Sequence, residues 1–320
     1  MRKALLMLLA AAMVGAGVTP TDVEAATKKK KPVATKKQAP RAAKPQRVKT
    51  AMRTKPSQRG ASIDDAQHLA VQSSAALVLD QTSGAILFEK NPTAVLPIAS
   101  ITKLMTAMVV LDAKLRLDET LVIGEEDVDI IKGTRSRLKV GTHLAREEML
   151  RLALMSSENR AAAALSRNYP GGRDAFVAAM NRKAQVLGLV DTRFQDPTGL
   201  TAANVSSPRD LAKMVDAAHQ YPLIREFSTT SNGEFTIAGR PQQFRNTNTL
   251  VNSPTWDIGL SKTGYINEAG KCLVMQAWLN NKPTIIVLLD SWGKMTRIGD
   301  ANRIKRWVES AALAPRHSAG

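Results

Sequence analysis

The sequence is poor in cysteine, histidine and aromatic residues. A single cysteine, Cys272, in 320 residues excludes a disulfide scaffold, and the four histidines form no His-Glu-x-x-His motif. The chain also lacks a Gly-x-Ser-x-Gly elbow, a Gly-x-x-x-x-Gly-Lys phosphate loop and a Gly-x-Gly-x-x-Gly turn. These absences give little support to a metalloprotease, a nucleotide hydrolase or a dinucleotide-dependent enzyme.

Acidic residues are missing from one segment, and this accounts for most of the net charge of +17. Residues 27–60 hold 13 Lys and Arg and no Asp or Glu, which leaves +4 for residues 61–320. That larger part is electrically ordinary, and no nucleic acid is expected as a partner. Because residues 26–60 are rich in Pro and Ala with hardly any large apolar side chains, we predict a disordered basic linker. We interpret it as a solvated spacer, with weak contact to anionic envelope polymers as the alternative.

The first 25 residues have the pattern of an export signal. Met1-Arg2-Lys3 is followed by the apolar run 4–18 and by Val23-Glu24-Ala25, a small-x-small cleavage site. A retained membrane anchor is the alternative, but the run is shorter than the roughly 20 residues that a span needs. The sequence therefore predicts a signal peptide (1–25), a linker (26–60) and one domain (61–320). We expect a periplasmic or otherwise exported protein that is soluble after signal cleavage.

Apolar patterning predicts strands at both ends of the domain and helices in the middle. The expected strands are 74–80, 85–88, 259–262, 272–279 and 283–289, and the expected helices are 101–111, 146–154, 158–166, 173–187, 208–220 and 296–313. This order favours one sheet built from both termini with a helical insertion, an α/β (α+β) fold. Cys272 has alternating apolar neighbours, which favours a buried, inert strand residue over a reactive thiol.

The first candidate for chemistry is Ser100-Ile-Thr-Lys103, at the start of an apolar helix. Ser and Lys three residues apart share one helix face, so the amine can take the hydroxyl proton. A lysine acts as a base near neutral pH only if burial or a second cation lowers its pKa. Two other Ser-x-x-Lys tetrads, 136–139 and 291–294, lie in loop sequence and do not open an apolar helix.

Two further motifs follow along the chain. Ser157-Glu158-Asn159 places a hydroxyl and an amide two residues apart, although an ordinary helix N-cap would explain the serine equally well. Lys262-Thr263-Gly264 is the only Lys-Ser/Thr-Gly triplet, and it lies on a predicted strand. A cation beside a hydroxyl can hold a carboxylate, and Gly264 allows close approach of a substrate backbone. The alternative without a functional role is an exposed lysine at a strand end, followed by a turn glycine.

The three motifs occur in order, each in a compatible setting, and together they resemble those of the low-molecular-mass penicillin-binding proteins, the serine D-Ala-D-Ala peptidases. The resemblance covers residues 65–312 and extends to four stretches, 97–103, 196–200, 246–250 and 259–273. It implies a β-lactamase/transpeptidase-like fold, with an antiparallel sheet flanked by helices beside an all-helical subdomain. It also implies that neither a metal nor a cofactor is needed.

The resemblance implies roles for the residues of the first two motifs. Ser100 is expected to be the acylated nucleophile, and Lys103 its general base. Ser157 is expected to relay the proton to the leaving amine, and Asn159 to orient Lys103 and the substrate.

The third motif is expected to bind the substrate. Lys262 would supply positive potential, and Thr263 would contact the substrate carboxylate beside Gly264. The backbone N–H groups of Ser100 and Tyr265 would form the oxyanion hole. The expected partners are peptidoglycan peptides and β-lactam inhibitors.

Two features are more similar to the D-alanyl-D-alanine endopeptidases, which cut cross-links between glycan strands, than to many carboxypeptidases. The chain ends soon after its closing helix, and residues 157–160 read Ser-Glu-Asn-Arg. A D-Ala-D-Ala carboxypeptidase that trims stem pentapeptides is the main alternative. A β-lactamase is less favoured because no Glu-x-x-Leu-Asn stretch supplies a deacylating carboxylate. A non-catalytic envelope-binding protein is a further alternative.

Overall fold

The computed structural model describes residues 69–293 and 295–311. The predicted signal peptide and basic linker lie outside these residues. None of the helices within the described ranges is long and apolar enough to span a membrane.

A five-stranded antiparallel sheet is built from both ends of the domain, as the sequence predicted. Its strands lie in the order β2-β1-β11-β10-β9, so the first hairpin pairs with the last strand. The strand bounds are β1 Ala75–Asp80, β2 Ile86–Lys90, β9 Asp257–Ile266, β10 Gly270–Leu279 and β11 Lys282–Ser291.

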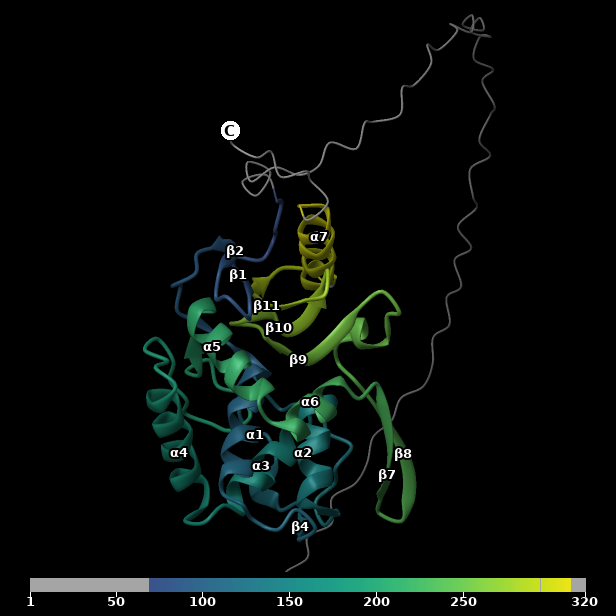
Figure 1. Cartoon of the computed structure of the whole chain (residues 1–320). Coiled ribbons are helices and arrows are strands. Elements are labelled where there is room, and N and C mark those ends of the chain that lie inside the picture. The colour runs from purple at the N-terminus through teal and green to yellow at the C-terminus, as the bar shows by residue number, and fades with distance from the viewer. Residues whose placement is uncertain (1–68, 294, 312–320) are drawn as a thin grey trace, which may run out of the picture. The chain divides into compact units, whose positions relative to one another are not determined.

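Helices cover both faces of this sheet (Figure 1). On one face, α5 (Pro208–His219) packs on β1, β10 and β11, and α6 (Pro222–Thr229) packs on β9. On the other face, α7 (Thr296–Ala311) packs on β10 and β11. Successive side chains of a strand point to opposite faces, so Leu77 joins the larger core cluster and Val78 the smaller one under α7. Coverage on both sides explains the continuous apolar run of β11.

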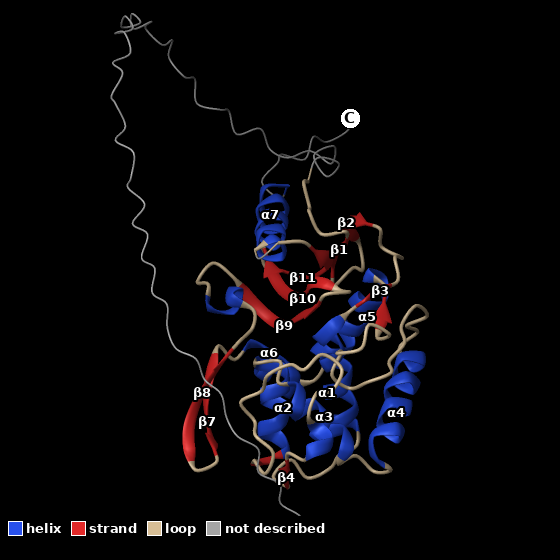
Figure 2. Ribbon diagram, turned by 180° about the vertical axis from the view of Figure 1, so that it is seen from behind, coloured by secondary structure: helices blue, strands red, loops and turns tan. Residues whose placement is uncertain are grey.

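The helical subdomain holds α1 (Lys103–Asp112), α2 (Arg146–Met155), α3 (Asn159–Arg167) and α4 (Gly172–Val186). Figure 2 shows these helices together, on the side of the sheet opposite α7. Eight of the ten residues of α1 are buried, because α2, α3, α4 and α5 all pack around it. The 3-10 turn η2 (Ala99–Thr102) leads directly into α1 and packs against β9. The start of α1 is therefore held between the subdomain and the sheet.

Several short elements were not expected from the sequence. They are α6, three two-stranded ribbons and the 3-10 turns η2, η3 (Glu125–Asp127) and η4 (Thr249–Asn252). The ribbons pair β3 (Leu96–Pro97) with β6 (Val205–Ser206), β4 (Thr120–Val122) with β5 (His143–Ala145), and β7 (Asn232–Ile237) with β8 (Arg240–Arg245). The predicted main helices and strands agree with the structure to within a few residues, except that the strand expected at 259–262 is longer and spans Asp257–Ile266.

The segment that precedes β1 is attached to α7 through one buried carboxylate. Asp300 is fully buried, and it accepts hydrogen bonds from the backbone N–H groups of Gln72 (3.0 Å) and Ser73 (2.8 Å) and from the Ser73 hydroxyl (2.6 Å). It also pairs with Arg303. This cluster joins the two ends of the domain.

We predict that Asp300→Ala lowers the free energy of unfolding by about 3 kcal/mol, because several buried donors lose their acceptor. Urea unfolding of the mature protein measures this loss. Asp118→Ala is the matched control, since Asp118 forms an exposed ion pair with Arg116, and it should change stability little. Equal stability of the Asp300→Ala variant and the wild type would contradict this role of the carboxylate.

Candidate active site

Ser100 lies in η2, at the junction of the helical subdomain and the sheet. The preceding residue, Ala99, has a φ of 48°, a left-handed conformation that is costly for alanine. The sequence predicted a helix over 101–111; the α-helix instead begins at Lys103, after one 3-10 turn that contains Ser100. Gly199 packs so closely on this turn that a Cβ there would lie 2.0 Å from the Ala99 carbonyl oxygen. The backbone around Ser100 is therefore tightly fixed.

Lys103 is completely buried and donates three hydrogen bonds through its amine. The acceptors are Ser100 Oγ (2.8 Å), Asn159 Oδ1 (2.8 Å) and the Thr198 carbonyl oxygen (2.7 Å). Each of the three N–H groups of the Lys103 ammonium therefore has an acceptor. One of these acceptors is the Ser100 hydroxyl, which the sequence analysis identified as the candidate nucleophile.

Burial lowers the pKa of Lys103 from its usual 10.5 to about 7. The carboxylates of Asp196 and Glu158 oppose this shift, because negative charge favours the ammonium form. At a pKa of about 7, a large fraction of the amine is neutral at neutral pH and able to accept a proton from Ser100.

The loop of residues 196–201 folds around the Asp196 carboxylate. This carboxylate accepts hydrogen bonds from the backbone N–H groups of Thr198 (2.6 Å), Gly199 (2.8 Å) and Thr201 (3.1 Å). The Thr106 hydroxyl on α1 donates to the Pro197 carbonyl oxygen (2.6 Å) and fastens the loop to the helix. The loop thereby aims the Thr198 carbonyl at Lys103.

Ser157 and Asn159 reach the same cluster from the turn between α2 and α3. Ser157 has a φ of 60°, and it is not the N-cap of α3, so the helix-cap interpretation is wrong. Asn159 is the first residue of α3; its Oδ1 accepts from Lys103, and its Nδ2 donates to Thr134 Oγ1 (3.1 Å). Its amide orientation is therefore fixed from both ends.

Lys262 is buried in the middle of β9, which rules out the exposed strand-end alternative. Its amine donates to Ser157 Oγ (2.9 Å) and to the Thr263 carbonyl oxygen (3.1 Å). Burial, with the charges of Lys103 and Arg297, lowers its pKa well below the usual value. An anionic group bound beside it would favour the charged form.

Thr263 and Gly264 continue this strand toward Ser100. The Thr263 hydroxyl donates to Thr247 Oγ1 (2.6 Å). A Cβ on Gly264 would lie 2.8 Å from the Ile98 carbonyl oxygen and 3.2 Å from the Ser100 nitrogen, so only glycine fits without displacement. Unlike Lys262 and Thr263, Tyr265 has an exposed side chain, and its hydroxyl donates to Asn267 Oδ1 (2.9 Å).

Sequence reasoning missed several groups around this cluster, Arg297 among them. From the start of α7, its guanidinium donates to the carbonyl oxygens of Gly264 (2.9 Å) and Cys272 (3.1 Å), and its charge lowers the pKa of Lys262. Thr134, Thr247 and the Thr198 carbonyl were likewise not assigned. They carry no motif of their own, although two of them lie in or beside stretches that the resemblance marked.

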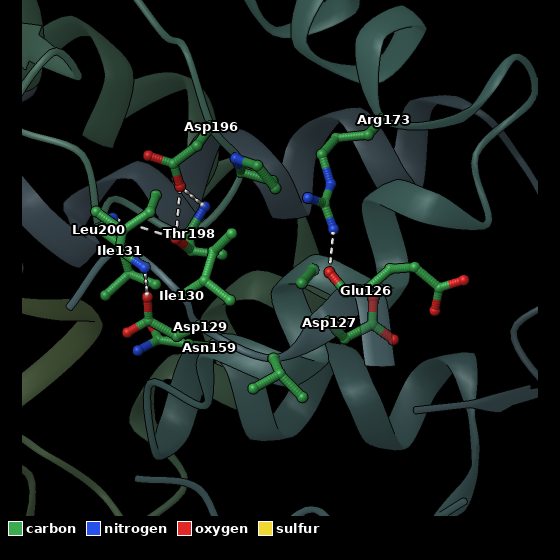
Figure 3. Close-up of a pocket in the computed structure, with 13 residues that line it drawn as sticks. Glu126, Asp127, Asp129, Ile130, Ile131, Asn159, Arg173, Asp196, Thr198 and Leu200 are labelled. Atoms are coloured by element: carbon green, nitrogen blue, oxygen red, sulfur yellow. Dashed lines mark hydrogen bonds between the residues drawn. The ribbon is translucent and has the colours of Figure 1, made fainter. Parts of the chain in front are cut away.

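A small cavity lies beside the start of α3 and the loop of residues 196–201 (Figure 3). Its wall includes Asn159 and Thr198, two of the three Lys103 acceptors, with Ile130 and Ile131 from a facing loop. Its volume of about 90 Å³ is enough for a few water molecules.

Two further points concern the reactivity of Cys272 and the grouping of possible metal ligands. Cys272 is fully buried, and burial raises its pKa to about 11, which confirms the prediction of an inert strand residue. Among the described residues, no three His, Cys, Asp or Glu side chains are grouped so as to hold a metal ion.

Comparison with known proteins identifies the family. Residues 62–293 match the D-alanyl-D-alanine carboxypeptidase family, peptidase S11. The chain is 52% identical over 270 residues to a D-alanyl-D-alanine endopeptidase of Pseudomonas aeruginosa, covering 83% of this chain and 86% of that protein. It is 48% identical over 252 residues to a D-alanyl-D-alanine endopeptidase of Escherichia coli K12, covering 77% of this chain and 80% of that one.

A solved structure supports the same assignment. The Streptomyces K15 DD-transpeptidase has a TM-score of 0.70 and 28% sequence identity, over 75% of this chain and 97% of that one. This likeness confirms the predicted fold class. The chain belongs to the D-alanyl-D-alanine carboxypeptidase family of peptidases, and it is a serine D-Ala-D-Ala peptidase.

Proposed function

We propose that this protein is a D-alanyl-D-alanine endopeptidase that hydrolyses D-alanyl bonds in peptidoglycan cross-links through an acyl-enzyme on Ser100. One observation carries the proposal: a buried lysine with a pKa of about 7 donates to the Ser100 hydroxyl at 2.8 Å. The two relatives above, each named an endopeptidase, favour the cross-link as substrate. Carboxypeptidases are also similar but less identical, such as one of Bacillus subtilis at 31%, and trimming of stem pentapeptides is the second candidate function.

Acylation begins with proton transfer from Ser100 Oγ to the neutral amine of Lys103, while Oγ bonds to the D-alanyl carbonyl carbon. The helix-start N–H of Ser100 and the strand N–H of Tyr265 stabilise the oxyanion that forms. The proton then passes through Ser157 Oγ, which lies 2.9 Å from the Lys262 amine, to the leaving nitrogen. The C–N bond breaks, and the D-alanyl group remains as an ester on Ser100.

Lys262 and Thr263 bind the carboxylate of the leaving group, and Arg297 adds to the positive potential there. Binding of this carboxylate returns Lys262 to its charged form. Water then attacks the ester with Lys103 again as base, which releases the D-alanyl carboxylate and restores the Ser100 hydroxyl.

Release of a bound β-lactam should be slow, because the two carboxylates whose charges act on Lys103 are engaged elsewhere. Glu158 accepts from the Ser136 hydroxyl (2.6 Å) and lies 3.8 Å from the Arg137 guanidinium. Asp196, which lies beside Lys103, uses its oxygens on the N–H groups of its own loop. The protein is therefore expected to be penicillin-sensitive rather than a β-lactamase.

Incubation of the mature protein with penicillin tests the acyl-enzyme. We expect a stable mass adduct on Ser100 that is absent from Ser100→Ala, because within the described residues Ser100 has the only hydroxyl that is hydrogen-bonded to the Lys103 amine. Digestion of cross-linked muropeptides then separates the endopeptidase from the carboxypeptidase. Penicillin that stays intact without an adduct would favour the non-catalytic alternative, and rapid hydrolysis would favour a β-lactamase.

The segments before the domain complete the proposal. Residues 1–25 act as an export signal that delivers the domain of residues 61–320 to the periplasm, and residues 26–60 act as a basic linker. The spacer role remains the preferred one for this linker, with contact to anionic envelope polymers as the alternative.

Exchange of the 13 Lys and Arg of residues 27–60 for Gln distinguishes the two roles. If the linker binds anionic envelope material, the unmodified protein should be retained on it more strongly at low salt, and the difference should fade as salt rises. The fraction bound to isolated envelope material at increasing salt measures this. Equal retention of the two proteins would leave the spacer role.

A further inference from the structure

A polar groove lies between the base of the β7–β8 hairpin and η4. It has a volume of about 430 Å³, and its lining residues are Ser231, Asn232, Gln243, Arg245 and Asn252. Every one of these side chains can form hydrogen bonds, and one carries a positive charge. The groove is therefore suited to a polar, anionic ligand rather than to an apolar one.

The groove retains unused hydrogen-bonding capacity. Asn232 donates to Ser231 Oγ (3.0 Å), and Gln243 donates to Glu234 Oε2 (2.7 Å), so each amide keeps its carbonyl oxygen as an acceptor. Arg245 is exposed, and within residues 69–293 and 295–311 its guanidinium has no hydrogen bond or ion pair. Amide acceptors beside a free guanidinium match the backbone N–H groups and a carboxylate of a peptide.

The groove lies next to the residues that are proposed to contact the leaving group. The Arg245 carbonyl oxygen accepts from Ser156 Oγ (3.1 Å), and Ser156 immediately precedes the proposed proton relay, Ser157. Two residues further along the chain, the Thr247 hydroxyl accepts from Thr263, the proposed carboxylate-binding residue. The groove thus adjoins the leaving-group side of the site.

The hairpin that forms the groove wall is held in place before any ligand binds. Phe235 and Phe244 stack edge to face with ring centroids 5.5 Å apart, on the face turned away from the groove. The guanidinium of Arg137 lies 3.6 Å above the Phe244 ring and donates to the Gln243 carbonyl oxygen (2.6 Å). A preformed wall reduces the entropy that binding has to overcome.

We infer that this groove binds the leaving stem peptide of a cross-link, with Arg245 pairing with a carboxylate of that peptide. The inference rests on the proposed endopeptidase function. A carboxypeptidase releases one D-alanine, which the strand motif can hold alone. An endopeptidase releases a whole peptide, which has to lie somewhere beyond Ser157 and Thr263, and the groove is the adjoining space with matching chemistry.

Arg245→Gln tests the inference with two substrates that share the same acylation step. We expect kcat/KM for a cross-linked muropeptide dimer to fall about tenfold, chiefly through KM, because a charge-assisted hydrogen bond is lost. The rate of Ser100 acylation by penicillin, which has no second stem, should stay within about twofold of the wild type. Asn252→Ala should show the same split in a milder form.

Arg240→Gln is the matched control. It removes the same charge from the same hairpin, at the tip, about 17 Å along β8 from Arg245, and should leave both rates unchanged. Unchanged dimer cleavage by Arg245→Gln would overturn the inference, and so would an equal fall in both rates, which indicates damage to the acylation step. A wild-type protein that is acylated by penicillin but does not cleave the dimer would overturn the endopeptidase proposal and this inference together.

Discussion

The site depends on the burial of two lysine amines between the sheet and the helical subdomain. Neither Lys103 nor Lys262 forms a direct ion pair within the described part of the chain, and both lie almost entirely out of contact with solvent. Burial of an unpaired ammonium is costly, so each amine shifts toward its neutral form. The fold therefore places an amine with a lowered pKa next to Ser100, and the proposed mechanism uses this amine as the base. Burial of the two amines lowers the stability of the fold locally. The packing of α1 against the surrounding helices offsets this cost.

The surrounding structure serves mainly to aim backbone and amide oxygens at these amines. The Asp196 carboxylate organises a loop whose Thr198 carbonyl reaches Lys103, and Thr134 fixes the Asn159 amide. Left-handed residues at positions 99 and 157 hold the two serines at their places, each on a different element. Ser100 is hydrogen-bonded to Lys103 and Ser157 to Lys262, so each serine is held by a lysine from another part of the site.

The sequence predicted the sheet, the main helices and the clustering of its three motifs, since these follow from apolar patterning and from side chains of distinctive chemistry. It did not predict α6 or the β7–β8 hairpin, whose alternation is short and broken by polar residues such as Gln242 and Gln243. It also missed the Thr198 carbonyl and Arg297. A backbone acceptor has no residue signature, and an arginine 35 positions after Lys262 reaches the strand only because α7 folds back over the sheet.

The central claim is that burial alone makes Lys103 a neutral base at neutral pH. A titration of the lysine side-chain carbons by NMR, with the Lys103 resonance assigned by its loss in Lys103→Arg, tests this claim most directly. We predict a midpoint of about 7, with the neutral form present above it and lost as the pH falls through it. A midpoint that stays at the usual value of 10.5 would show that the amine is charged at neutral pH and would contradict the mechanism.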